Sequence, residues 1–197
     1  MTRITGNSSG SLGLHPAVYF YSHRGKHSQH LFLAVTSLIA KKVRANNKEF
    51  FKTFTNVRVR LEQCLIRNKP ILGQAIVQIG SSQRVPRLTR MLESFIEVFK
   101  VDGSISPDDL LKFLKLEGKL LASDLQASKT AFSKETKSEI FLKNSIQNAL
   151  PCPICRGLVD PNKSISFDHI LHVRDGGKGE SDNGQITHPY CNSGIKN

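Results

Sequence analysis

Apolar residues recur at helical spacing along the first hundred positions of the chain. They return every three or four residues, so that in each stretch they line one face of a helix. Turn-forming or helix-breaking residues separate these stretches, at Asn46-Asn47, Gly80-Ser81-Ser82 and Pro86. The pattern predicts four helices, over Leu31–Val43, Phe50–Leu65, Ile71–Ile79 and Leu88–Phe99.

The segments around these helices carry other signals. Residues 1–13 are rich in Ser and Gly, and we expect them to be flexible, whereas residues 15–22 open on Pro16 and predict a short extended or turn segment. Ser106-Pro107-Asp108-Asp109 predicts a helix start, because serine can cap, proline suits the first turn and carboxylates favour the positive end of the dipole. A further helical region is expected over Leu120–Ala149, in one or two pieces.

Beyond Pro151 the pattern changes to a tail rich in Gly, Asp and Cys. Residues 164–173 alternate like a half-buried strand, and Asp175-Gly176-Gly177 then turns the chain into a polar loop. We therefore predict an α+β protein, in which a basic, mainly helical domain over residues 1–150 precedes a small module over residues 151–197.

The formal net charge of +12 indicates a polyanionic partner. Its excess lies wholly in residues 1–150, because the tail carries five basic and five acidic side chains. Between Arg24 and Lys69 there are eleven basic residues against Glu49 and Glu62 alone. Such a stretch suits a phosphate backbone. A solvated helix face is the alternative explanation.

No segment predicts export or membrane insertion. The first ten residues lack the apolar core of a signal peptide, and the longest apolar run, around Leu31 to Ala40, is too short to span a bilayer. We expect a cytosolic protein with no membrane partner.

Two pairs of metal-type side chains frame the tail. Cys152 and Cys155 form one pair, and His188 and Cys191 form the other. Two ligands separated by two residues can reach one ion, and a module of this size buries too little apolar surface to fold without support. We therefore predict a structural zinc site, with a redox dithiol or coincidence as alternatives.

The other cysteine and most other histidines lack such a setting. Cys64 shares a helical stripe with Leu61 and Leu65, which favours a buried, inert thiol. No thiol or carboxylate accompanies the four N-terminal histidines, which are His15, His23, His27 and His30. We therefore favour surface or DNA-facing positions for them over a second metal site.

Between the two pairs, Asp168-His169-Ile170, Gly176-Gly177 and Asn183 are followed by Asn192 and Lys196. In this order, over residues 152–196, the tail resembles the HNH endonuclease family. The resemblance implies a ββα-metal fold that holds one divalent cation and cleaves nucleic-acid phosphodiesters.

The resemblance also implies a role for each residue. His169 would deprotonate water, Asp168 and Asn192 would hold Mg²⁺ or Mn²⁺, and Asn183 would brace the loop and orient His169. Asn192 stands where the family often has His, which gives an HNN variant. In the same tail we expect three basic residues to contact nucleic acid, Lys196, Lys178 and Arg174, and His172 is a weaker candidate for a phosphate or water contact.

Residues 10–22 are similar to a linker in prokaryotic defence proteins that join a ParB-like domain to an HNH nuclease and resemble modification-dependent restriction systems. That likeness implies a cytoplasmic role against phage, with the ParB-like domain absent here or supplied by a partner. The expected activity is metal-dependent nicking or cleavage of DNA, double-stranded by preference, with RNA still open. A zinc-stabilised DNA-binding or adaptor module without catalysis is the alternative.

Overall fold

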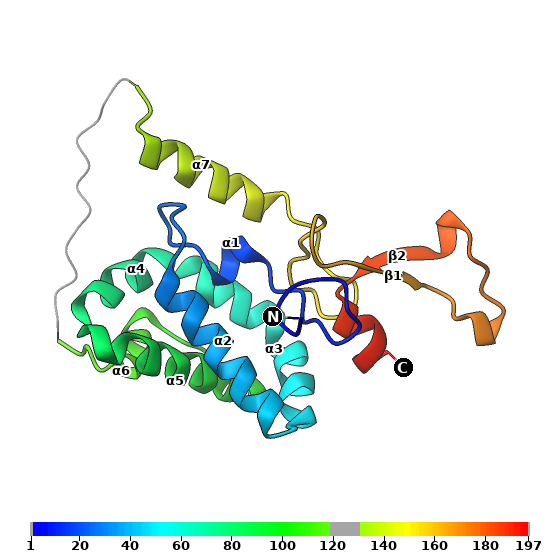
Figure 1. Cartoon of the computed structure of the whole chain (residues 1–197), viewed down its shortest axis with the longest axis horizontal. Coiled ribbons are helices and arrows are strands. Elements are labelled where there is room, and N and C mark those ends of the chain that lie inside the picture. The colour runs from blue at the N-terminus through cyan, green and yellow to red at the C-terminus, as the bar shows by residue number, and fades with distance from the viewer. Residues whose placement is uncertain (1, 119–130, 197) are drawn as a thin grey trace. The chain divides into compact units, whose positions relative to one another are not determined.

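A computed structural model describes residues 2–118 and 131–196 of the chain. Its helices are α1 (Pro16–Tyr19), α2 (Gln29–Arg44), α3 (Lys48–Arg67), α4 (Lys69–Gln78), α5 (Ser81–Lys100), α6 (Pro107–Phe113) and α7 (Lys134–Gln147) (Figure 1). The tail adds strands β1 (Ser166–His169) and β2 (Gly184–Thr187) and the short helical turns η1 (Val173–Asp175), η2 (Ser181–Asn183) and η3 (Cys191–Ile195).

Contacts divide the described residues into two compact units. The helical unit contains residues 16–47 and 60–148, apart from the undescribed stretch 119–130. The tail unit contains residues 2–15, 48–59 and 149–196, so it takes in the N-terminal segment and the first half of α3. A domain boundary between residues 150 and 151 stays a prediction.

The helical unit contains three of the four expected helices whole, α2, α4 and α5, and the second half of the fourth, α3. α2 and α5 pack against each other, and their apolar stripes supply buried side chains such as Leu38, Leu92 and Phe95. The Thr89 hydroxyl of α5 donates to the Ala34 carbonyl of α2 at 3.3 Å. Within the described residues, no helix is long and apolar enough to cross a membrane.

Three helix boundaries differ from expectation. Pro86 was predicted to break the helix, but α5 runs through it. The proline lies in the second turn of α5 and has no N–H to donate to the carbonyl four residues earlier. That carbonyl is near the exposed start of the helix, so the lost hydrogen bond is tolerated. Residues 16–19 form the helical turn α1, because Pro16 takes the first helical position. α7 ends the region predicted over Leu120–Ala149, whose residues 120–130 lie outside the described residues.

The prediction that residues 1–13 are flexible is wrong for the described part of that segment. Ile4 and Leu12 are buried, and the Leu12 amide donates to the Arg3 carbonyl at 2.9 Å. The Tyr190 amide donates in turn to the Ser11 carbonyl at 2.9 Å, within the tail unit. Burial of these apolar side chains and the backbone hydrogen bonds thus hold the described part of this segment within the tail unit.

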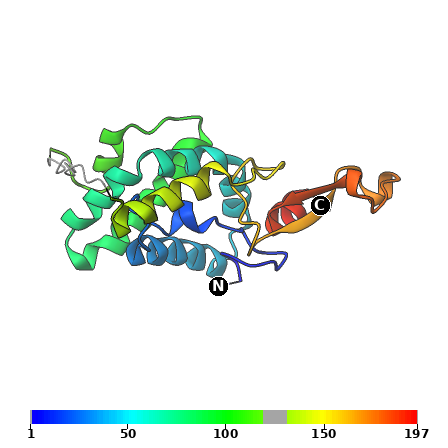
Figure 2. The same cartoon turned by 90° about the horizontal axis from the view of Figure 1, so that it is seen from above.

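The tail folds as strand, strand and helix. β1 and β2 are antiparallel, with Asp168 opposite Gln185 and His169 opposite Gly184, and η3 contacts β1 (Figure 1 and Figure 2). The mainly helical chain with this small sheet is compatible with the predicted α+β class. The strand expected over residues 164–173 ends at His169. The Ile170 amide still donates to the Asn183 carbonyl at 2.8 Å, but the Leu171 amide donates to the Asn183 side chain instead of to a strand backbone.

Candidate functional site

The four predicted zinc ligands meet in the tail unit. Cys152, Cys155, His188 and Cys191 are all buried, and one ligand atom from each lies within 4.8 Å of the other three. Cys155 Sγ lies 3.3 Å and Cys191 Sγ 3.8 Å from His188 Nδ1. Three sulfurs and one imidazole nitrogen at this spacing can hold a metal ion such as zinc. The donor set therefore fits the predicted structural site.

A hydrogen bond orients the histidine of this cluster. His188 Nε2 lies 2.9 Å from the Leu158 carbonyl oxygen, so Nε2 carries the proton and Nδ1 presents its lone pair to the sulfurs. Metal-binding histidines usually donate their second nitrogen in this way. Burial also lowers the pKa of the His188 imidazole, which favours the neutral form that a metal needs.

The three thiols of the cluster shift one another's pKa, so that ionisation of one disfavours ionisation of the others. Hydrogen bonds from Cys155 and Cys191 lower the pKa of Cys152, whereas the same contact with Cys152 raises the pKa of Cys155 to about 11 and also raises the pKa of Cys191. One buried thiolate therefore disfavours a second. A bound cation would remove this conflict, because it stabilises all three thiolates together.

Arg58 lies next to this cluster, a position that no pattern in the sequence predicts. Arg58 is 1% exposed, and its positive charge acts to lower the pKa of both Cys155 and His188. A guanidinium nitrogen donates to the Gly13 carbonyl at 3.0 Å. Three thiolates and one neutral imidazole around Zn²⁺ would carry a net negative charge, which the buried Arg58 can offset.

Asp168 lies on the same strand as His169, with its side chain almost fully buried. Its Oδ2 accepts from Gln185 Nε2 and from Lys196 Nζ, both at 2.8 Å. Lys196 Nζ also contacts the His169 carbonyl oxygen. Two oxygens of β1 thus converge on one positively charged atom. Because hard divalent cations prefer oxygen ligands, this point fits such a cation.

Asn192 and Lys196 contact β1 at successive points along η3. Asn192 Nδ2 donates to Ser166 Oγ at 2.8 Å and to the Phe167 carbonyl at 3.2 Å, whereas Lys196 reaches Asp168 and His169. The two side chains are four residues apart, so they share one face of the turn. Lys196, which was expected to face phosphate, forms an ion pair with Asp168 here.

An open hollow of about 530 Å³ brings Asp168, His169 and Asn183 together. Both strands line it, along with residues of the loop between them, including Gly179, Glu180 and Ser181. Asn192 is not among its lining residues. Three of the four predicted catalytic residues therefore line the hollow, whereas Asn192 contacts Ser166 and Phe167 from η3.

Asn183 holds the loop after β1 in place. Its Oδ1 accepts from the Leu171 amide at 2.7 Å, and its Nδ2 donates to the carbonyls of Leu171 at 3.0 Å and Lys178 at 2.8 Å. A β-carbon on Gly177 would lie 1.9 Å from the Leu171 carbonyl oxygen, so only glycine fits this turn. These bonds end the strand and fix the backbone that follows His169.

We expect Asn183→Ala to loosen this loop, because three hydrogen bonds of about 1 kcal/mol each are lost. Hydrogen exchange at the Leu171 amide should accelerate, and any nuclease activity should fall about 10- to 100-fold. Asn162→Ala is the matched control, since Asn162 is exposed in the same unit and only its backbone amide forms a described hydrogen bond. Unchanged exchange at Leu171 would contradict the bracing role.

Burial removes some of the basic residues that were expected to face nucleic acid. Arg58 and Lys69 are 1% and 6% exposed. Lys178 and Arg174 are exposed in the loop between the strands, where Arg174 Nε lies 3.8 Å from Asp175 Oδ2.

His15 is buried, against the expected surface position, whereas Cys64 is buried as predicted. Among the described residues, the four-ligand cluster is the one group that could hold a metal by its Cys, His and acidic side chains.

No curated protein and no solved structure matches the chain. A protein-family model does match part of it, and the match contains the metal cluster, both strands and η3. Residues 152–197 match the family described as HNH endonuclease.

Proposed function

We propose that this protein is a metal-dependent endonuclease that hydrolyses DNA phosphodiester bonds. The HNH family implies nuclease or DNA-binding activity, and one observation favours the nuclease. Asp168 and His169 line one open hollow at the end of β1, and the Asp168 carboxylate already faces a cationic atom. A purely structural zinc module has no need for such a pair.

In this proposal His169 accepts a proton from the attacking water, which lies in the hollow. Asn183 is a positioning residue, because it holds the backbone that follows His169 through Leu171. Asp168 and Asn192 would hold Mg²⁺ or Mn²⁺ through their side-chain oxygens. When bound, that cation supplies charge neutralisation at the phosphate and stabilises the departing 3′ oxygen. The product then carries a 5′ phosphate.

The zinc cluster keeps a structural role in this mechanism. All four of its ligand positions come from the protein, so no position is left for water or substrate. Cys191 begins η3, the turn that also carries Asn192 and is followed by Lys196, so an ion held there fixes the approach of η3 to β1. Lys178, Arg174 and the exposed basic residues of the helical unit supply phosphate contacts.

DNA is the favoured substrate, and RNA is compatible with the same chemistry because the 2′-OH takes no part in it. The segment of residues 10–22, similar to a linker of prokaryotic defence nucleases, supports a role in restriction of phage in the prokaryotic cytoplasm. A ParB-like domain or partner would then supply regulation.

The test incubates supercoiled plasmid with zinc-loaded protein in buffer containing Mg²⁺, Mn²⁺ or no added divalent cation. Chelators are left out, since they would also remove the zinc. The proposal expects relaxed or linear DNA only with the added cation. The alternative, a zinc-stabilised binding module, expects salt-dependent gel shifts with unchanged DNA topology.

Lys196 offers a separate test of the cation site. The Lys196 ammonium forms an ion pair with the Asp168 carboxylate and would compete there with a cation. Lys196→Met should therefore tighten Mn²⁺ binding by roughly threefold to tenfold. Paramagnetic resonance titration of the zinc-loaded protein measures this directly, and Lys196→Arg serves as the control that keeps the charge. Weaker or unchanged Mn²⁺ binding in Lys196→Met would place the cation away from Asp168.

A further inference from the structure

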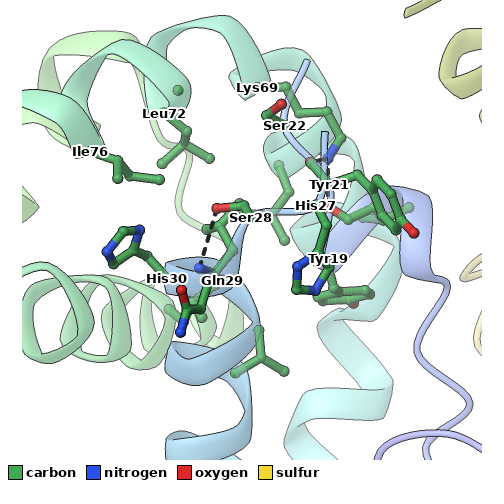
Figure 3. A pocket seen from close by; sticks show the side chains of 16 residues that line it. Tyr19, Tyr21, Ser22, His27, Ser28, Gln29, His30, Lys69, Leu72 and Ile76 are labelled. Carbon is green, nitrogen blue, oxygen red and sulfur yellow. Dashed lines mark hydrogen bonds between the residues drawn. The ribbon is translucent and has the colours of Figure 1, made fainter. Parts of the chain in front are cut away.

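The helical unit contains a cavity that the proposed nuclease chemistry does not use. Its volume is about 300 Å³, and residues of α1, α2, α4, α5, the end of α3 and the loop after α1 line it (Figure 3). This volume lies at the lower end of small-molecule sites. It is about twice that of an engineered cavity that takes up benzene. A compact organic molecule therefore fits.

Lys69 brings a positive charge to the wall of this cavity. It is 6% exposed, and its Nζ donates to the carbonyls of Val18 and Tyr21 at 2.7 Å each. Within residues 2–118 and 131–196 no carboxylate pairs with it, and burial lowers its pKa to about 8. A buried charge without an opposite charge is costly. An anion in the cavity would offset that cost.

The rest of the wall is mainly apolar. Leu72 and Ile76 project from α4 on one side of the cavity, and Tyr21 and His27 lie close to Lys69 on the other (Figure 3). The rings of Tyr21 and His27 meet edge to face, with centroids 5.7 Å apart. A ligand with a charged head beside Lys69 and an apolar body against α4 matches this division.

We propose that this cavity binds a small carboxylic acid with an apolar body. The Lys69 ammonium has three N–H groups and uses two on backbone carbonyls, so one is left for a ligand. A carboxylate has two acceptor oxygens to satisfy, whereas a phosphate group has three and carries more charge. The proposal is independent of the nuclease assignment.

Isothermal titration of the full chain with 1-naphthoate tests this, with the neutral 1-naphthamide as the matched ligand. One naphthoate should bind per chain, and the amide should bind at least about tenfold more weakly. Lys69→Met should cause a similar loss, and Ile76→Phe, which fills the apolar end, should abolish binding. Lys112→Met, an exposed change on α6, should leave the affinity unchanged.

Several results would overturn the proposal. Naphthoate that fails to bind the wild-type protein at millimolar concentration would do so, as would equal binding of acid and amide. Binding that survives Ile76→Phe would place the ligand elsewhere. If Lys69→Met does not fold by circular dichroism, the acid–amide comparison on wild-type protein and the Ile76→Phe variant still decide the matter. No DNA is present, so failure of the nuclease assignment would not affect the result.

Discussion

His169→Ala is expected to reduce the rate of plasmid cleavage about 10²- to 10⁴-fold, the usual contribution of a positioned proton acceptor. His169 lines the hollow with Asp168 and Asn183, and no other histidine lines it. The alanine variant should keep its zinc content, because the four cluster ligands lie elsewhere. Initial cleavage rates at saturating Mg²⁺ measure the effect, and zinc analysis confirms an intact scaffold.

His172→Ala is the matched comparison for this loss. His172 lies three residues further along the chain, in the loop after β1, and does not line the hollow, so the effect should stay below about tenfold. Two outcomes would remove His169 from the proposed mechanism: equal rates for His169→Ala and wild type, or a larger loss in His172→Ala.

The second large effect concerns the zinc cluster. Cys152→Ser should release the metal and unfold the tail unit, since structural zinc sites supply much of the folding free energy of small modules. The expected loss is on the order of several kcal/mol. It should appear as loss of zinc by elemental analysis and as loss of a thermal transition. Cleavage should disappear with it, because η3 begins at Cys191 and contacts β1.

Cys64→Ser is the control for this change, because Cys64 is also buried but belongs to the helical unit and is not one of the four cluster residues. It should bind as much zinc as the wild type. A Cys152→Ser protein that keeps stoichiometric zinc and its thermal transition would show that the four residues do not form the structural site.

Periodicity and ligand spacing anticipated much of this fold. Helical stripes located α2 to α5, since each helix buries one apolar face. Ser106 and Asp109 form the expected capping box at the start of α6. Two pairs of ligands with two intervening residues located the metal cluster, because that spacing is a local property of the chain. The order of Asp168, His169 and Asn183 likewise anticipated residues that meet in one hollow.

Contacts between distant segments were not visible in the sequence. Residues 1–13 were predicted to be flexible because Ser and Gly dominate them, yet Ile4 and Leu12 bury against partners that only the fold supplies. Gln185 was missed as a partner of Asp168, because the register of β1 and β2 decides that pairing. The sequence pattern placed Arg58 among the basic residues of a surface stretch, whereas the fold buries it beside Cys155.

The ends of the nicked DNA test the central claim most directly. Zinc-loaded protein and Mg²⁺ should produce nicks that DNA ligase seals without prior treatment, since hydrolysis at the 3′ oxygen leaves a 5′ phosphate and a 3′ hydroxyl. Plasmid that is bound but covalently intact with every divalent cation would contradict the claim. So would nicks that ligase seals only after a kinase has added the 5′ phosphate.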